Sequence, residues 1–412
     1  MSNYPELVPL DALVSDLRDG THGTHERTES GVPFLSAKNI TDSGHVSWDD
    51  DDDKISESEY RALNASFSLE PNDLLLTIVG SLGRRAVFLG EKVTFQRSVA
   101  YIRPRKDKVD PGYLFYAIGH ESFRQTMVRR SNATAQAGLY LGELAKIHVG
   151  WFPISEQRFI AHILDTLDTQ IQKTEALIAK LEKVKEGLLH DMLTRGIDEN
   201  GRLRHSPEQA PELYKNSPFG LIPRSWSSYL CRDLFRLSSG KPRTKADIAR
   251  RRAGTIPVYG GNGINGQTGD HLVASPTIVI GRVGENCGTV HRTWGKAWIT
   301  DNALYATWIS PEINIDFLYR YLDWHQLSSL QVATGQPLMT QSVIAEQLVG
   351  IPQRAEQIKI SEALFRLERR IANENTDLAK LRSTKLGVIE DLLTGRVRVT
   401  PLLEQAQATT PA

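Results

Sequence analysis

The chain has 412 residues, of which 40% are hydrophobic, and it contains 49 basic side chains, 49 acidic side chains and two cysteines, Cys231 and Cys287. This length favours two or three domains with ordinary hydrophobic cores. Two cysteines exclude a disulfide framework, and no apolar run approaches the ~18 residues that a membrane span needs. The start, MSNYPELVPL, lacks the pattern of a signal peptide, so we expect a cytoplasmic protein without a membrane partner.

Residues 1–150 predict a mixed α/β domain. Apolar runs at 32–35, 74–79 and 96–103 are typical of strands, and 113–118 is typical of an amphipathic helix. The second strand leads into a glycine-rich turn, GSLG, that two arginines follow. This order of elements indicates a sheet with glycine turns at its edge.

A long helix is predicted at 151–197, where apolar residues recur with the 4,3 spacing of a coiled coil. The apolar seam contains Ile160, Leu164, Leu167, Ile171 and Leu181. About 40 helical residues at 1.5 Å each give a rod of ~60 Å. Gly196 marks its end.

The second half of the chain repeats this order. A polar linker is expected at 198–217, a second α/β domain at 218–350, a second long helix at 351–398 and a disordered tail at 399–412. Aligned without a gap, 16 of 49 positions are identical between 149–197 and 349–397. The corresponding seam contains Ile360, Leu364, Leu367, Ile371 and Leu381. The repeat predicts a pseudo-twofold molecule.

The polar seam positions favour an antiparallel pair of helices within one chain. In one antiparallel register Lys185 lies beside Glu374 and Thr174 beside Lys385, whereas a parallel pair would stack the two lysines. The alternative is a coiled coil that joins two chains in an ordinary dimer. A partner helix in the same chain makes that alternative less favourable.

Polar and basic residues near the glycine turns form a candidate DNA-binding set. Arginine binds phosphate or guanine edges, and amides read adenine edges. The set consists of Lys38, Asn39, Arg84, Arg85, Gln96, Arg97, Tyr259, Asn262, Asn265, Arg282 and Asn302. Taken singly, each is more often an ordinary surface or turn residue. The net charge of zero lacks the basic excess that is usual in nucleic-acid binders.

Several short motifs resemble the specificity subunit of type I restriction-modification systems. They are the Glu-Gln pairs 156–157 and 356–357 that head the long helices, PFLSAKNI at 33–40, GIDENGRLR at 196–204, GLIPRSW at 220–226 and IPVYGGNG at 256–263. The resemblance covers almost the whole chain. It implies two target-recognition domains that each read half of an asymmetric bipartite site in double-stranded DNA, separated by helices that set the gap.

The same resemblance implies the partners and the absence of catalysis. The helices would bind two methylation subunits, and restriction/translocase subunits would complete the enzyme. S-adenosylmethionine, ATP and magnesium are then expected on these partners, and no cofactor on this chain. The alternatives are a coiled-coil scaffold without a DNA role and a stand-alone DNA-modifying enzyme.

Isolated motifs give weak support to the enzyme alternative. GNGING at 261–266 matches GxGxxG after a strand, but no helix is predicted to follow it. No GxxxxGK[ST] motif is present. His22 and His25 lack further ligands at metal spacing, and the acidic run 49–53 is typical of a solvated loop. Asp301 and Glu285 lack the lysine spacing of a nuclease.

Overall fold

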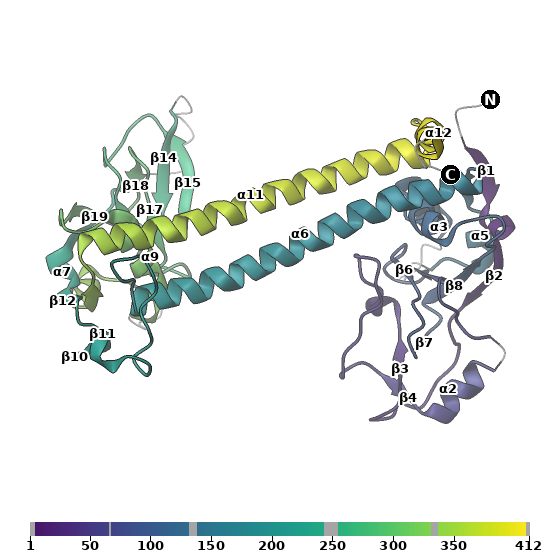
Figure 1. The fold of residues 1–412 in the computed structure, drawn as a ribbon, viewed down its shortest axis with the longest axis horizontal. Helices are drawn as coiled ribbons and strands as arrows, with labels where there is room; N and C mark the ends of the chain where they lie inside the picture. The colour runs from purple at the N-terminus through teal and green to yellow at the C-terminus, as the bar shows by residue number, and fades with distance from the viewer. Residues whose placement is uncertain (1–4, 66, 132–137, 243–253, 331–336, 409–412) are drawn as a thin grey trace. The chain divides into compact units, whose positions relative to one another are not determined.

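The computed structural model describes residues 5–65, 67–131, 138–242, 254–330 and 337–408, and it divides into two compact units (Figure 1). Unit 1 comprises Met1–Glu175 and Thr376–Ala412, and unit 2 comprises Ala176–Asn375. Each unit contains one α/β domain and parts of two long helices, α6 (Ile154–Thr194) and α11 (Arg354–Leu393). The predicted mixed fold with an internal repeat is therefore confirmed.

The domain of unit 1 is built on a four-stranded sheet. Its elements are β1 (Glu6–Pro9), α1 (Leu10–Leu13), β2 (Val14–Asp19), β3 (Val32–Leu35), η1 (Ala37–Asn39), β4 (Lys54–Ile55), α2 (Glu57–Leu63), β5 (Leu74–Thr77), β6 (Arg85–Val87), β7 (Thr94–Phe95), β8 (Val99–Pro104), α3 (Pro111–Ile118), α4 (Glu121–Arg130), α5 (Leu141–Ala145) and β9 (His148–Trp151). The larger sheet has the order β2-β8-β5-β6, a smaller one β4-β3-β7, and β1 pairs with β9.

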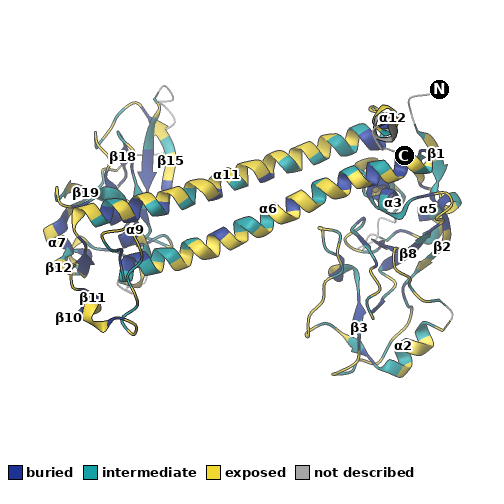
Figure 2. Ribbon diagram, viewed as in Figure 1, coloured by how far each residue is buried: buried dark blue, intermediate teal, exposed yellow. Residues whose placement is uncertain are grey.

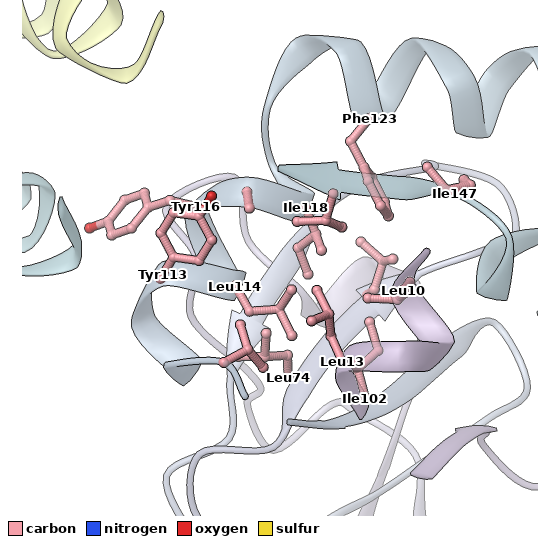
Figure 3. Packing of buried hydrophobic residues seen from close by; sticks show 14 of the residues in the cluster. Leu10, Leu13, Leu74, Ile102, Tyr113, Leu114, Tyr116, Ile118, Phe123 and Ile147 are labelled. Carbon is pink, nitrogen blue, oxygen red and sulfur yellow. The ribbon is translucent and has the colours of Figure 1, made fainter. Parts of the chain in front are cut away.

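Helix α3 closes the core of unit 1. Its buried side chains include Leu114 and Ile118, which belong to one apolar cluster with Leu10, Leu13 and Ile102 (Figure 3). Asp110 caps the helix by accepting a hydrogen bond from the Tyr113 amide at 3.0 Å, and Pro111 occupies its first turn. The start of α6 and the end of α11 pack on the same cluster.

The domain of unit 2 repeats this topology. Its elements are η2 (Pro211–Leu213), β10 (Tyr214–Ser217), β11 (Gly220–Pro223), β12 (Ser227–Leu230), α7 (Cys231–Leu234), β13 (Phe235–Ser239), β14 (Ile256–Gly260), β15 (Gly263–Thr268), β16 (Ile278–Gly281), β17 (Val290–Arg292), β18 (Trp298–Ile299), β19 (Ala303–Ile309), α9 (Ile315–Trp324), η3 (Leu327–Leu330), α10 (Gln341–Ala345) and β20 (Leu348–Ile351). The sheets have the orders β13-β19-β16-β17 and β15-β14-β18, and β12 pairs with β20.

The predicted seams are the buried stripes of the long helices (Figure 2). In α6, Ile160, Leu164, Ile171 and Leu181 are buried and Leu167 is half-buried. In α11, Ile360, Leu364 and Ile371 are buried, and Leu367 and Leu381 are half-buried. This repeating pattern is the signature of helices that pack side by side.

Within unit 1 the two helices run antiparallel, as predicted. Going forward along α6, Glu156 binds Arg398, Asp168 binds Lys385 and Glu175 binds Arg382, so the partner numbers fall as the α6 numbers rise. The predicted register differs in detail, because Lys385 reaches Asp168 rather than lying beside Thr174. A carboxylate is a stronger partner for an ammonium group than a threonine hydroxyl, and Thr174 donates instead to the Gln170 carbonyl oxygen at 2.9 Å.

Unit 2 shows the same antiparallel sense, because Glu356 near the start of α11 accepts a hydrogen bond from the Ile197 amide just after the end of α6, but it lacks the predicted lysine pair. Lys185 forms its ion pair with Glu182 and Glu374 forms one with Arg370, each at 3.9 Å within its own helix. Lys185 also acts electrostatically on Asp323 of α9. The direction of pairing was therefore predicted from the sequence, and the polar partners were not.

The repeated Glu-Gln pairs join each long helix to its surroundings. Gln157 is fully buried, and its side-chain oxygen accepts a hydrogen bond from the Asp110 amide at 2.8 Å. Gln357 does the same for the Asn314 amide at 2.7 Å. Each glutamine therefore fixes the start of the domain helix, α3 or α9, against the long helix of its unit.

Two regions predicted to be irregular are ordered. The linker at 198–217 contains η2 and β10, and Tyr214 within it is buried with its hydroxyl satisfied, since it donates to the His205 carbonyl oxygen at 2.6 Å. Within the tail predicted to be disordered at 399–412, Val399 is buried and Thr400–Ala408 form α12, and 409–412 lie outside the described residues. The ordered tail depends on a contact distant in sequence, since Thr400 donates to Glu156, whereas β10 pairs with the neighbouring β11.

Candidate nucleic-acid interface

The larger sheets of the two units place the same turn at the same edge. In unit 1, Thr77 of β5 pairs with Val99 of β8, and in unit 2, Gly281 of β16 pairs with Ala303 of β19. The turn that precedes β8 is therefore equivalent to the turn that precedes β19. This equivalence allows a residue-by-residue comparison of the two domains.

Arg97 and Asp301 occupy equivalent positions in the two domains, because each lies two residues before its strand, β8 in unit 1 and β19 in unit 2. Both side chains are exposed. A cation in one domain thus stands where the other domain carries an anion. Residues of opposite charge at one position of a repeated fold give the two edges different binding preferences.

A glycine brings a second loop against each of these turns. The Gly20 amide donates to the Val99 carbonyl oxygen at 2.9 Å, and the Gly240 amide donates to that of Ala303 at 3.0 Å. A Cβ atom on either glycine would collide with backbone carbonyl oxygens of the turn. The next residue, Thr21 in unit 1 and Lys241 in unit 2, is consequently held beside the turn.

In unit 1 the turn borders a groove of about 640 Å³. The lining includes Asp19, His22, Ile78, Arg97 and Tyr140. The Tyr140 side chain is 71% exposed, and His22 lies 2.7 Å from Asp19. An arginine and an exposed aromatic ring in one groove provide charge for phosphate and a flat face for a base or sugar.

In unit 2 the equivalent edge of the larger sheet also carries cations, but at positions other than that of Arg97. The backbone carbonyl oxygen of Arg282 accepts the Met339 amide at 2.8 Å, as that of Ile78 accepts the Leu139 amide in unit 1. Arg282 thus replaces an apolar residue, and the exposed Lys241 replaces Thr21. The Arg282 guanidinium is close to the Ser239 hydroxyl, at 3.4 Å.

Three residues of the predicted DNA-binding set are buried or bound within the folded chain. Asn39 is buried, and its side chain caps η1 and donates to the Ser47 carbonyl oxygen at 3.0 Å. Arg85 donates to the Phe115 carbonyl oxygen at 2.6 Å, and burial lowers its pKa to about 10. Tyr259 is buried in β14. These contacts hold the three side chains within the fold, and their part in DNA binding stays a prediction.

Two further predicted cations are engaged in ion pairs at the surface. Lys38 binds Asp52 at 2.6 Å, and Arg84 binds Asp42 at 2.9 Å. The Lys38 ammonium holds the pKa of Asp52 at about 2. The remaining members of the set are at least partly accessible, namely Gln96, Arg97, Asn262, Asn265, Arg282 and Asn302.

The glycine-rich turns of the two domains begin at equivalent glycines. Gly80 and Gly284 both have positive φ, at 77° and 78°, and each follows a valine that bridges to the loop before the short helix α5 or α10. The turn GSLG therefore matches the segment that begins at Gly284, and not the one that begins at Gly281. As a result Arg282 precedes its turn, whereas Arg84 follows the equivalent turn.

Sequence reasoning missed four residues of these edges. His22 and Asp301 were considered only for metal binding and nuclease chemistry, and Lys241 was not placed in the predicted DNA-binding set. Tyr140 gave no signal, because an exposed tyrosine cannot be distinguished from a buried one by type. Within the residues that the structure describes, no group of three or more His, Cys, Asp or Glu side chains could hold a metal ion. In the same part of the chain no helix is long and apolar enough to cross a membrane.

Comparison with known proteins identifies the class to which this fold belongs. The family model described as type I restriction modification DNA specificity domain matches residues 21–183 and again 223–383. The MjaVIII specificity subunit of Methanocaldococcus jannaschii is 24% identical over 400 residues, which cover 91% of this chain and 88% of that protein.

Solved structures show the same fold. The type I system S subunit from M. genitalium aligns with a TM-score of 0.60 at 16% identity, covering 95% of this chain and 97% of that one. A structure described in terms of complex assembly and conformational transition of the type I system aligns with a TM-score of 0.54 at 12% identity, covering 96% and 99%.

The chain therefore belongs to the type I restriction modification DNA specificity family, and it carries the family domain twice. It is a DNA specificity subunit of a type I restriction-modification complex. Its two recognition domains fit the reading of a site in two separate parts.

Proposed function

We propose that the edges around Arg97 in unit 1 and around Lys241, Arg282 and Asp301 in unit 2 read the two halves of one DNA site. The observation that carries this proposal is the shared turn position that bears opposite charges in the two domains. Arginine pairs with the O6 and N7 atoms of guanine, and an aspartate accepts from the amino group of cytosine. Each domain would thus read a different half-site with the same backbone frame.

Double-stranded DNA is the proposed ligand, and the flanking cations would bind its phosphates. Lys241 and Arg282 offset the local charge of Asp301, so the polyanion can approach this edge. Gln96, Asn262, Asn265 and Asn302 add accessible amides near the same turns. Amides are suited to adenine edges.

The long helices are the proposed spacer and partner-binding surface. With 41 and 40 residues, α6 and α11 are each about 60 Å long. Two methylation subunits would bind them near each end of the repeat, and restriction/translocase subunits would join that assembly in the cytoplasm. In this proposal the chain is not catalytic, and S-adenosylmethionine, ATP and magnesium are bound by the partner subunits.

The decisive experiment is to determine the sequence methylated by the complete complex. The chain is co-expressed with its methylation subunit, and the methylated motif is mapped across the genome. We expect two short words separated by a fixed gap, and no turnover by the chain alone with cofactor and DNA. A single uninterrupted word would contradict the assignment of one half-site to each domain, and turnover by the isolated chain would contradict its non-catalytic role.

A further inference from the structure

The glycine-rich turns that follow β5 and β16 differ in charge between the two units. The Thr77 amide donates to the Arg84 carbonyl oxygen, and the Gly281 amide donates to that of Thr289, each at 2.8 Å. Arg84 therefore stands where unit 2 carries Thr289, and strand pairing places the next residue, Arg85, where unit 2 carries a valine. Two adjacent cations of unit 1 thus replace two uncharged side chains of unit 2.

A third arginine of unit 1 reaches this turn from helix α4. Gly83 has a φ of 87°, and a Cβ atom on it would lie 2.8 Å from the Cγ atom of Arg124. The equivalent Gly288 has a φ of 86° and lies against Ser328 instead. The Arg124 side chain therefore packs on the turn of unit 1 at the position where unit 2 has a serine.

The three arginines line one groove of about 850 Å³, which we call the arginine groove. Its other walls are the loop at 41–44 and the adjoining parts of α6 and α11, and all of these residues belong to unit 1. Five cations and three carboxylates contribute to the lining. The groove therefore contains more basic than acidic side chains.

The carboxylates of the arginine groove are already bound by cations. The three pairs are Asp42–Arg84, Glu175–Arg382 and Asp168–Lys385. Arg124 is 55% exposed and has Glu121 at 3.9 Å, and Arg85 donates to the Phe115 carbonyl oxygen. The pKa of Arg85 is lowered to about 10, first by burial and then by the nearby charge of Arg124. An anion in the groove would relieve the repulsion between these two cations.

The arginine groove adjoins the reading edge of unit 1. Ile78 and Val79 line the groove that contains Arg97, whereas residues 81–84 line the arginine groove. Between these two stretches lies only Gly80, which has a φ of 77°. A duplex that contacts Arg97 is thereby close to side chains whose charge is complementary to its backbone.

We propose that the arginine groove binds a phosphate of the DNA backbone beside the half-site of unit 1. This inference rests on the proposed function, in which the edge around Arg97 reads that half-site. Contacts to phosphates fix the position of a protein on the duplex and carry no sequence information. At this turn unit 1 would hold the backbone through arginines, whereas the equivalent Thr289 and Ser328 of unit 2 supply no charge.

The test exchanges Arg124 for the residue of unit 2 and measures DNA binding against salt concentration. The full-length chain in complex with its methylation subunit is titrated with a duplex that carries the methylated motif, between about 50 mM and about 200 mM salt. Arg124→Ser removes the charge, and Arg124→Lys keeps it. Arg129→Ser is the matched control, because Arg129 is an exposed arginine of the same helix and does not line the groove.

One phosphate contact contributes about 0.9 to the slope of log affinity against log salt concentration. Arg124→Ser should therefore lower this slope by about 1, and it should weaken binding by the same factor for every base variant of the half-site. Between the two salt limits its disadvantage relative to the wild type should shrink about threefold. Arg124→Lys and Arg129→Ser should keep the wild-type slope.

Asp42→Asn should act in the opposite direction, because it frees Arg84 for phosphate and thus steepens the slope. An unchanged slope in Arg124→Ser, or an equal change in Arg129→Ser, would overturn the inference. Loss of a methylation subunit from the Arg124→Ser complex in native mass spectrometry would also overturn it, because the groove would then bind protein. A wild-type complex without preference for the methylated motif would instead contradict the proposed function.

Discussion

Replacing Glu356 by alanine should destabilise unit 2 strongly. The Glu356 carboxylate binds Arg204 at 2.5 and 3.0 Å, and it accepts from the Ile197 amide at 3.0 Å and from the Trp226 indole at 3.1 Å. The Glu356 and Arg204 side chains are only 12% and 14% exposed. Alanine would leave a guanidinium and two neutral donors without their acceptor in a site that water barely reaches.

The free energy of unfolding is expected to fall by about 3 kcal/mol. We take the lower end of the range for removal of one partner from a buried pair, because both groups keep some contact with water. For about 200 residues this corresponds to a fall in Tm of roughly 6–12 °C. The measurement is thermal unfolding of the full chain in its complex. Glu346→Ala is the control, because Glu346 pairs with Arg232 at the surface and its loss should cost under about 1 kcal/mol. Equal shifts for the two variants would refute the argument that burial of the Glu356 network decides its contribution.

Three further outcomes are expected. Arg97→Ala should weaken binding to one half-site by about 1–3 kcal/mol, and Asp301→Ala should alter binding to the other half-site only, in titrations against single-base variants of each half-site. The control is the exposed Arg61→Ala. Equal losses at both half-sites would contradict two independent reading edges. Insertion of seven residues into both α6 and α11 should lengthen each helix by ~10 Å and widen the gap in the methylated motif by about three base pairs, whereas an unchanged gap would exclude the helices as the spacer. The Asp52 carboxyl should titrate by NMR with a pKa of about 2, and Lys38→Met should raise this pKa towards the ordinary value of 3.8. Because the pKa is depressed in the folded state, the stability that this pair contributes is present above pH 3.8 and is lost as the pH falls towards 2. A pKa that Lys38→Met leaves unchanged would show that the ammonium is not the cause of the shift.

The local periodicity of the long helices made them predictable. A seam such as Ile160, Leu164 and Leu167 has a spacing that only a helix places on one face, so the sequence alone determines the helix and its buried stripe. The repeat of this seam 200 residues later then indicates the partner helix. The Glu-Gln pairs were visible as repeats, but nothing local shows that Gln157 binds a domain helix while Glu156 binds the segment after α11.

The candidate site was less predictable, because residue type does not reveal which way a side chain faces. Asn39 and Asn262 are both amides near a predicted strand, yet the first is a buried cap and the second is exposed. Arg84 and Arg85 are adjacent, and strand pairing turns Arg85 onto α3 while Arg84 remains at the surface.

The sequence by itself determined the repeat, the long helices and their antiparallel sense, because each depends on spacing along one chain. Only the tertiary structure decided that Arg97 and Asp301 share one position and that Thr21 and Lys241 share another. Both equivalences depend on hydrogen-bonded strand pairs between segments distant in sequence, and no local pattern contains the register of such pairs.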